Sequence, residues 1–164
     1  MKKLIASIMV VAMVFGTISM TGVNVKASEK TAFSAVAKAY GKSYPLSSKN
    51  VIKTSRKNIF GKYSKVLGVS AKYFKSYKAA SKKGKCEYVS AIFKATSKAN
   101  VAKIKKALKT FVSKEKSSGA NYFSAKGKGI LNKAKVGSKG KYVYLFVLDN
   151  KGNSKAINAF KKNA

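Results

Sequence analysis

The chain has 164 residues, of which 36 are basic and four are acidic, and its formal charge at neutral pH is +32. A hydrophobic content of 46% excludes the disordered class, which combines high charge with few apolar residues. Every basic residue except Arg56 is a lysine, and histidine is absent. Imidazole is the commonest general base and metal ligand, so its absence disfavours catalysis. The excess of lysine favours polyanionic partners.

The N-terminus predicts an export signal. Lys2 and Lys3 give it a charged start, residues 4–20 are mostly apolar, and Val25 and Ala27 supply the small residues of a signal-peptidase site. We therefore expect residues 1–27 to be removed and the mature protein to be secreted, either extracellular or associated with a Gram-positive cell wall. The alternative is a retained membrane anchor, because about 17 apolar residues is the lower limit for spanning a bilayer.

The next part of the chain has the spacing of short amphipathic helices. A helix that begins at Ser28 and ends at Gly41 is indicated by apolar residues on one side: Phe33, Val36, Ala37 and Tyr40. A loop over residues 44–48 precedes a second expected helix over residues 50–60. A third helix, capped by Ser70, is expected to carry three aromatic residues on one face: Tyr73, Phe74 and Tyr77.

Residues 85–95 alternate in a way that predicts a strand. The clearest helix follows and is expected to end at Gly119; its apolar residues fall on one face: Val101, Ile104, Ala107, Leu108, Phe111 and Val112. Lysines cover the rest of this helix, so its outer face is expected to be solvated. Residues 121–131 indicate a short helix broken by Gly127 and Gly129.

A hairpin is predicted from residues 134–136, a turn at residues 137–140, and a second strand over residues 142–148. The second strand is apolar on both faces, which places it in the middle of a covered sheet. Residues 152–154 form a turn and cap, and a final helix is marked by three apolar residues: Ala156, Ile157 and Phe160.

These elements predict an α+β fold, in which N-terminal helices precede a strand–helix–β-hairpin–helix unit whose small sheet is covered by helices. We expect a helical segment over residues 28–62 and an α+β domain over residues 63–164, forming one globular unit. Cys86 has no partner for an internal disulfide. It is either a buried thiol or the site of an intermolecular disulfide.

Four stretches carry a resemblance to a known family: Lys65–Val69, Glu87–Ala95, Val101–Leu108 and Lys139–Val147. From about Tyr63 onward the chain resembles the domain-of-unknown-function family, number 4358 in that series, of clostridial and related Gram-positive extracytoplasmic lipoproteins. The resemblance implies an extracytoplasmic α+β domain and supplies no activity. Two departures are the missing lipobox cysteine and the lysines at polar positions that are often acidic in the family.

No catalytic, cofactor-binding or metal-ligating set is indicated. The four acids are scattered along the sequence and are expected to have local structural roles. The segment Gly41-Lys42-Ser43 resembles the end of a phosphate-binding loop but lacks the glycine that this motif needs five residues earlier. The remaining candidates are lysines expected to contact a polyanion, with ordinary solvated surface as the alternative. They are Lys82, Lys83, Lys85, Lys103, Lys105, Lys106, Lys109, Lys126, Lys128, Lys133, Lys135, Lys139 and Lys141.

The expected function is therefore that of a secreted, non-enzymatic cationic protein held electrostatically on anionic cell-wall polymers or an anionic lipid surface. No small-molecule substrate or cofactor is indicated. Two alternatives stay open: a sequence-nonspecific module that binds extracellular nucleic acid, and a membrane-active antimicrobial protein.

Overall fold

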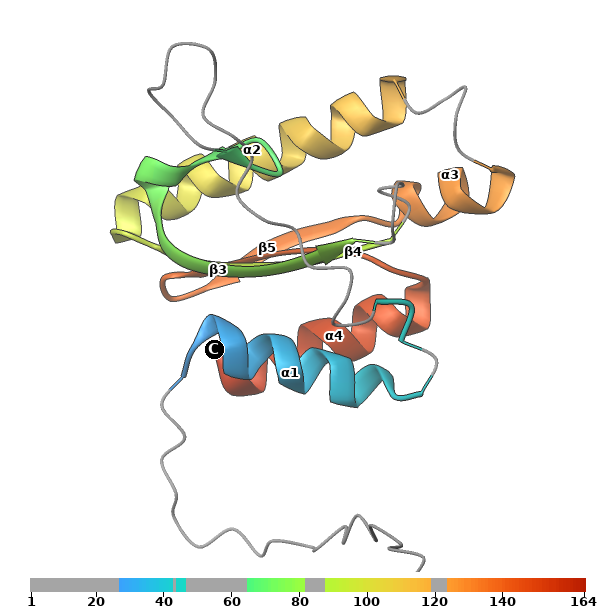
Figure 1. Ribbon diagram of the computed structural model, residues 1–164, viewed down its shortest axis with the longest axis horizontal. Helices are drawn as coiled ribbons and strands as arrows, with labels where there is room; N and C mark the ends of the chain where they lie inside the picture. Colours follow the sequence, from blue (N-terminus) through green and yellow to red (C-terminus); the bar gives the residue numbers. More distant parts are fainter. Residues whose placement is uncertain (1–26, 43, 47–64, 82–87, 119–123) are drawn as a thin grey trace, which may run out of the picture.

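The computed structural model describes residues 27–42, 44–46, 65–81, 88–118 and 124–164 (Figure 1). In chain order its elements are α1 (Glu29–Tyr40), β1 (Lys65–Val66), β2 (Val69–Ser70), the 3₁₀ turn η2 (Ala71–Tyr73), β3 (Phe74–Ser81), β4 (Val89–Ala95), α2 (Lys98–Ser118), α3 (Ala125–Asn132), β5 (Lys135–Lys139), β6 (Tyr142–Val147) and α4 (Asn150–Asn163). The predicted α+β class is confirmed.

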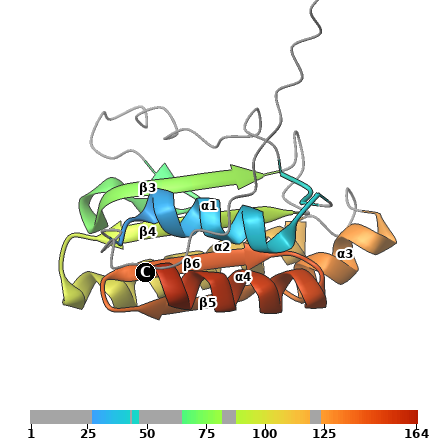
Figure 2. The same cartoon turned by 90° about the horizontal axis from the view of Figure 1, so that it is seen from below.

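The longer strands form one antiparallel sheet in the order β3–β4–β6–β5. Helix α2 packs on one face of this sheet, with the β1–β2 pair beside it. Helices α1 and α4 lie side by side on the other face (Figure 1 and Figure 2). The sheet is therefore the middle layer of three, and it separates two hydrophobic cores.

The central strands β4 and β6 are buried on both faces, as the apolar run over residues 142–148 predicts. Phe93 and Leu145 face α2, whereas Ile92 and Phe146 face the layer of α1 and α4. Because side chains alternate along a strand, a strand with helices on both sides has no solvent-facing positions. This explains why the hydrophobic run is continuous.

The predicted third helix is wrong, because the residues after η2 form the edge strand β3. The register of β3 against β4 shifts between Phe74 and Ser76, which is a β-bulge. Phe74 and Tyr77 therefore share a face, and their ring centroids lie 5.3 and 5.8 Å from that of Phe93. Two aromatic residues three positions apart would also share the face of a helix, so their spacing did not distinguish the two structures.

The long helix expected around residues 101–112 is confirmed as α2. The short helix expected over residues 121–131 is confirmed within the described residues as α3, but Gly127 and Gly129 lie inside it rather than breaking it. Ser124 caps α3 by accepting a hydrogen bond of 3.1 Å from the Gly127 N–H. This cap and the burial of Ile130 stabilise a helix that its two glycines weaken.

The predicted hairpin is present, but its turn is shorter than expected and lies later in the chain. Residues 137–139 belong to β5, and only Gly140 and Lys141 connect the two strands. Gly140 has φ +56°, a conformation that favours glycine. Gly137 lies within β5, and glycine is required there because a Cβ would overlap the ring of Tyr144, its cross-strand partner. The sequence pattern did not show that glycine here serves packing rather than a turn.

The last helix also starts earlier than predicted. Residues 152–154 lie inside the first turns of α4, and Asp149 is its N-cap, accepting a hydrogen bond of 2.6 Å from the Gly152 N–H. The Tyr40 hydroxyl at the end of α1 donates a second hydrogen bond of 2.6 Å to the same carboxylate. Since the Tyr40 ring occupies the space where a side chain of Gly152 would lie, the two helices pack closely at this point.

Several predictions concern residues outside the described ranges: the export signal before Ala27, the helix over residues 50–60, and Cys86. Within the described ranges, no helix combines the length and apolar character needed to cross a membrane.

Gly152→Ala should destabilise the fold, although alanine is normally favoured in a helix. The added methyl group would overlap the Tyr40 ring, and such overpacking costs about 1–3 kcal/mol. The matched control is Gly129→Ala in α3, where no atom lies within 4 Å of the new Cβ and a gain of roughly 0.5–1 kcal/mol is expected. Urea unfolding monitored by circular dichroism measures both, and equal effects of the two substitutions would contradict the close packing of Tyr40 on Gly152.

Candidate functional site

The outer face of α2 carries the densest set of predicted lysines in the described part of the chain. The inner face of this helix buries Ile104, Leu108 and Val112 against the sheet. With 3.6 residues per turn, Lys106, Thr110 and Ser113 point away from the core, whereas Ala107 and Phe111 pack against its edge. A hollow of about 860 Å³ lies over this outer face. Its described lining residues all belong to α2: Ala102, Lys105, Lys106, Lys109, Thr110, Ser113, Lys114, Ser117 and Ser118.

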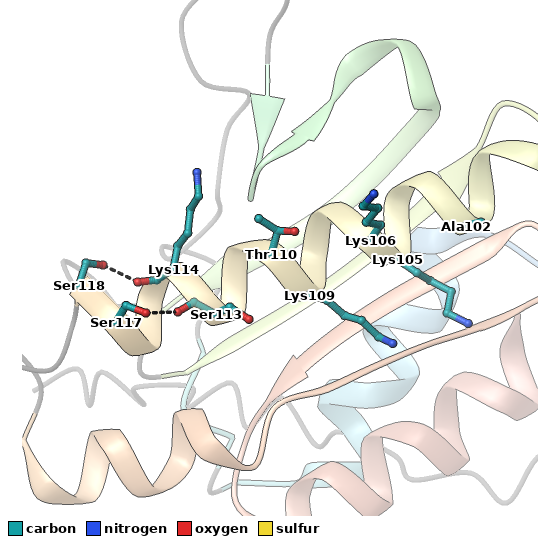
Figure 3. A pocket seen from close by; sticks show the side chains of 9 residues that line it. All are labelled: Ala102, Lys105, Lys106, Lys109, Thr110, Ser113, Lys114, Ser117 and Ser118. Carbon is teal, nitrogen blue, oxygen red and sulfur yellow. Dashed lines mark hydrogen bonds between the residues drawn. The ribbon is translucent and has the colours of Figure 1, made fainter.

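The long and short side chains of this face are interleaved along the helix. Lys105 and Lys109 extend to one side of the helix, and Lys106 and Lys114 extend to the other (Figure 3). Short side chains alternate with lysines along the lines of residues four apart: Lys106 lies between Ala102 and Thr110, and Lys109 precedes Ser113 and Ser117. We call this outer face the α2 trough and define it by the described residues that line the hollow.

None of the acids in the described residues lines the α2 trough. Glu29 is 7% exposed in the first turn of α1, and Asp149 caps α4, so both belong to the layer on the other side of the sheet. Glu115 is part of α2 but is half-buried, and burial raises the pKa of its carboxyl group. Among the described lining residues, no carboxylate offsets the positive potential of these lysines.

A second hollow, of about 410 Å³, lies where α2 meets the edge strand β5. It shares Lys109 and Ser113 with the α2 trough, and its other lining residues are Val112, Ala134, Lys135 and Val136. The two hollows are therefore neighbours, and the second adds an apolar surface beside the lysines. Of the predicted lysines, this hollow brings together Lys109 from α2 and Lys135 from β5.

The structure does not gather all the predicted lysines into one surface. Lys103 lies on α2 but outside the trough lining, with its Nζ 5.4 Å from the centroid of the Tyr73 ring. Lys139 belongs to β5 and donates a hydrogen bond to the Lys161 carbonyl of α4, on the opposite side of the sheet. The alternation of β5 places Lys135 on the same face as Lys139, so Lys135 lines the second hollow only from the strand edge.

The remaining predicted lysines lie elsewhere. Lys126 and Lys128 are exposed on α3, Lys133 follows that helix, and Lys141 is exposed in the hairpin turn. Three predicted lysines, Lys82, Lys83 and Lys85, are outside the described residues. The described part of the predicted set is thus spread over α2, α3 and the β5–β6 hairpin, and only Lys105, Lys106 and Lys109 line the trough together.

Sequence reasoning missed the hydroxyl residues of the trough and did not include Lys114 among the contact candidates. Thr110, Ser113 and Ser117 recur at intervals of three and four residues, which is the spacing of one helix face. That signal was present in the sequence. It was overlooked because exposed serines and threonines are common on helices and carry no charge.

A separate cavity of about 190 Å³ contains an acid with a perturbed pKa, which is a common feature of chemical sites. It is lined by Tyr40, Asp149, Lys151, Gly152 and Lys155. The hydrogen bond from Tyr40, then the Gly152 N–H and nearby lysine charges, lower the pKa of Asp149. Burial, and then the hydrogen bond to Asp149, raise the pKa of the Tyr40 hydroxyl well above its usual value. The pair links α1 to α4, and a structural role accounts for both shifts.

In the described residues there is no group of three or more histidine, cysteine, aspartate or glutamate side chains placed to hold a metal ion. The chemistry that the described surface offers is therefore that of ammonium and hydroxyl donors, and it suits anionic acceptors.

The depressed pKa of Asp149 predicts a pH-dependent contribution to stability. The pKa of Asp149 in the folded protein lies below its unfolded value of about 4. The ionised carboxylate therefore stabilises the fold at pH values above the unfolded pKa. This stabilisation is lost as the pH falls through the folded-state pKa. Asp149→Asn keeps a capping oxygen but removes the charge. The difference in unfolding free energy between wild type and Asp149→Asn, measured by urea unfolding, should shrink between about pH 5 and pH 2. A difference that stays constant over this pH range would contradict the lowered pKa of Asp149.

Comparison with known proteins identifies a family. No curated protein and no solved structure matches the chain. The model of a family described as "Domain of unknown function (DUF4358)" matches residues 60–148, which is more than half of the chain. The matched region runs from before β1 to the end of β6, so it contains the sheet and the α2 trough, whereas α1 and α4 lie outside it. The resemblance seen in the sequence is confirmed, and the chain belongs to this family of unknown function.

Proposed function

We propose that this protein acts by binding rather than by catalysis, as a secreted cationic protein that associates electrostatically with anionic polymers of the cell envelope. The observation that carries the proposal is the outer face of α2. Its lysines border a hollow that has no acid among its described lining residues. Polyanions are the ligands that an uncompensated cluster of ammonium groups attracts.

The choice among polyanions rests on the predicted export signal. Wall teichoic acid, anionic lipid headgroups and extracellular nucleic acid all carry phosphate charges that lysine can meet. A protein that leaves a Gram-positive cell reaches the polymers of its own envelope first, so these are the proposed partners. Retention there would be salt-dependent, because attraction between exposed charges is screened beyond about 10 Å at 0.1 M salt.

The use of lysine rather than arginine supports a tolerant mode of binding. An arginine guanidinium forms a planar fork that pairs with phosphate in a fixed geometry, whereas the lysine ammonium is a mobile, hydrated point charge. The described lining of the trough holds no carboxylate that would fix one of its lysines in place. We therefore propose affinity for a class of polymer and not for one sequence or one small molecule.

The proposal is tested by replacing five lysines of α2 with glutamine. The α2 variant changes Lys103, Lys105, Lys106, Lys109 and Lys114; the control variant makes the same charge change on the other layer, at Lys30, Lys38, Lys151, Lys155 and Lys162. We expect wild type and the control variant to be retained on purified Gram-positive cell walls at low salt. Both should be released toward 1 M salt, where the screening length falls to about 3 Å. The α2 variant should be released at much lower salt than the control variant.

Three results would overturn the proposal. Equal retention on intact walls and on walls stripped of their anionic polymers would show that these polymers are not the partner. Retention that persists at high salt would show that the attraction is not electrostatic. Tighter binding to duplex DNA, or leakage from anionic vesicles at concentrations below those needed for wall binding, would favour the nucleic-acid or membrane-active alternative. Thermal unfolding of each variant checks that all of them are folded.

A further inference from the structure

We propose that the free edge of β5 binds an extended segment of a partner protein, which adds to the sheet as a further strand. The segment that fits alternates apolar and acidic side chains. Its apolar side chains enter the hollow between α2 and β5, and its acidic side chains lie beside Lys135 and Lys139 on the other face of the strand. This inference goes beyond the proposed function and does not depend on it, because the ligand is a polypeptide and its recognition uses the backbone of β5.

The edge of β5 presents backbone groups that the described sheet leaves unpaired. β5 is the last strand in the order β3–β4–β6–β5, and Figure 2 shows it at the border of the sheet farthest from β3. A two-residue turn joins Lys139 to Tyr142, so these two residues form a hydrogen-bonded pair. Hydrogen-bonded and non-hydrogen-bonded pairs alternate along an antiparallel ladder, so the N–H and C=O groups of Val136 and Ser138 point to the outer edge. Such an edge is a template for a further strand.

The two faces of β5 differ in chemistry at this edge. Val136 turns toward α2, and together with Val112 and Ala134 it forms the apolar part of the described lining of the second hollow. Lys135 and Lys139 occupy alternate positions and are exposed on the face that carries α1 and α4. A strand added to β5 continues this alternation, so each of its side chains meets either the hollow or the lysines. The matching segment therefore has apolar and acidic residues in turn.

A hydroxyl group lies between the two lysines of β5. Gly137 separates them in the strand, and a Cβ on Gly137 would overlap the hydroxyl group of its cross-strand partner, Tyr144. The Tyr144 side chain thus reaches from β6 over the backbone of β5, in the direction of the free edge. Burial raises the pKa of Tyr144, so the hydroxyl keeps its proton at neutral pH. It can donate a hydrogen bond to a carboxylate placed opposite Gly137.

The charges beside this edge select the partner. The described residues of β5 and of the second hollow include three lysines, Lys109, Lys135 and Lys139, and no acid. A second copy of the chain, paired antiparallel through β5 about Gly137, would place Lys135 opposite Lys139 twice. Like charges directly opposite one another destabilise a sheet, and edge lysines protect strands from self-association in this way. The same lysines attract acidic side chains, so the partner is an acidic segment of another protein and not a second copy.

Two peptides of identical composition test the predicted pattern. One is a labelled peptide of alternating valine and glutamate, and the other has the same residues in two blocks, so that the charge is unchanged. Fluorescence anisotropy with the intact protein measures the affinity for each. We expect the alternating peptide to bind about tenfold more tightly, which corresponds to about 1.4 kcal/mol, because only this peptide matches both faces of β5 at once. Diffuse electrostatic attraction would not distinguish the two, and equal affinities would overturn the inference.

Methylation of the peptide backbone tests the strand pairing without altering the protein. In a segment added antiparallel to β5, the residues that face the hollow lie opposite Val136 and Ser138, and their amides point toward β5. Methylating the valine amides should therefore weaken binding about tenfold. Methylating the same number of glutamate amides, which point away from β5, should change binding less than about twofold. Equal losses from the two sets would show that the peptide does not pair as a strand, contrary to the inference.

Substitutions in the protein test the location of the site. Ser138→Pro removes an outward N–H without removing a bond between β5 and β6, and Lys135→Gln/Lys139→Gln removes the two charges. Each variant should weaken binding of the alternating peptide about five- to tenfold. The control pair, Lys30→Gln/Lys38→Gln at exposed positions of α1, should change binding less than about twofold. Circular dichroism checks that each variant is folded, and unaltered binding in both β5 variants would place the peptide elsewhere and overturn the inference.

The outcomes separate this inference from the proposed function. If cell walls retain the protein but the alternating peptide has no advantage over the block peptide, the proposed function stands and this inference fails. If the peptide binds as expected but cell walls do not retain the protein at low salt, the reverse holds. Tighter binding of poly(glycerol phosphate), lost in Lys135→Gln/Lys139→Gln but kept in Ser138→Pro, would assign these lysines to a polyanion and overturn the inference.

Discussion

The burial of β4 and β6 between two helical layers is what allows a chain with a formal charge of +32 to fold. Like charges repel one another, so the lysines must lie at the surface while apolar contacts supply the stabilising free energy. Both faces of the sheet are used for this purpose. Helix α2 is the part of the structure where the two requirements meet, because its inner face buries leucine and isoleucine and its outer face carries lysine.

Two of the described acids, Asp149 and Glu29, serve the structure of the other layer, and no described acid lines the α2 trough. Asp149 caps α4 and accepts a hydrogen bond from Tyr40, so it joins the two helices of one layer. Glu29 is buried in the first turn of α1, where a negative charge is favoured by the helix dipole. The distribution of acids therefore stabilises one side of the sheet and leaves the α2 side able to attract anions.

The family match covers the sheet and α2 but not α1 and α4. The trough is thus built on the part of the chain that the family describes, while one of the two cores also needs the flanking helices. Side-chain charge is a property of this sequence and not of the backbone arrangement. The family fold consequently supplies a platform for the trough without specifying what lies in it.

The sequence by itself determined the elements whose apolar pattern has one clear period. The spacing of Ile104, Leu108 and Val112 specified α2, and the continuous apolar run of β6 specified a covered central strand. The sequence did not determine β3, because a bulge gives Phe74 and Tyr77 the three-residue spacing of a helix. Nor did it show that Gly152 serves packing, since the Tyr40 ring that requires glycine there lies 112 positions earlier in the chain. The lysine-rich character of the site was readable from composition and periodicity. Which lysines share a surface was decided only by tertiary structure, because strand alternation turns Lys139 toward α4 while Lys109 lies on the opposite side of the sheet.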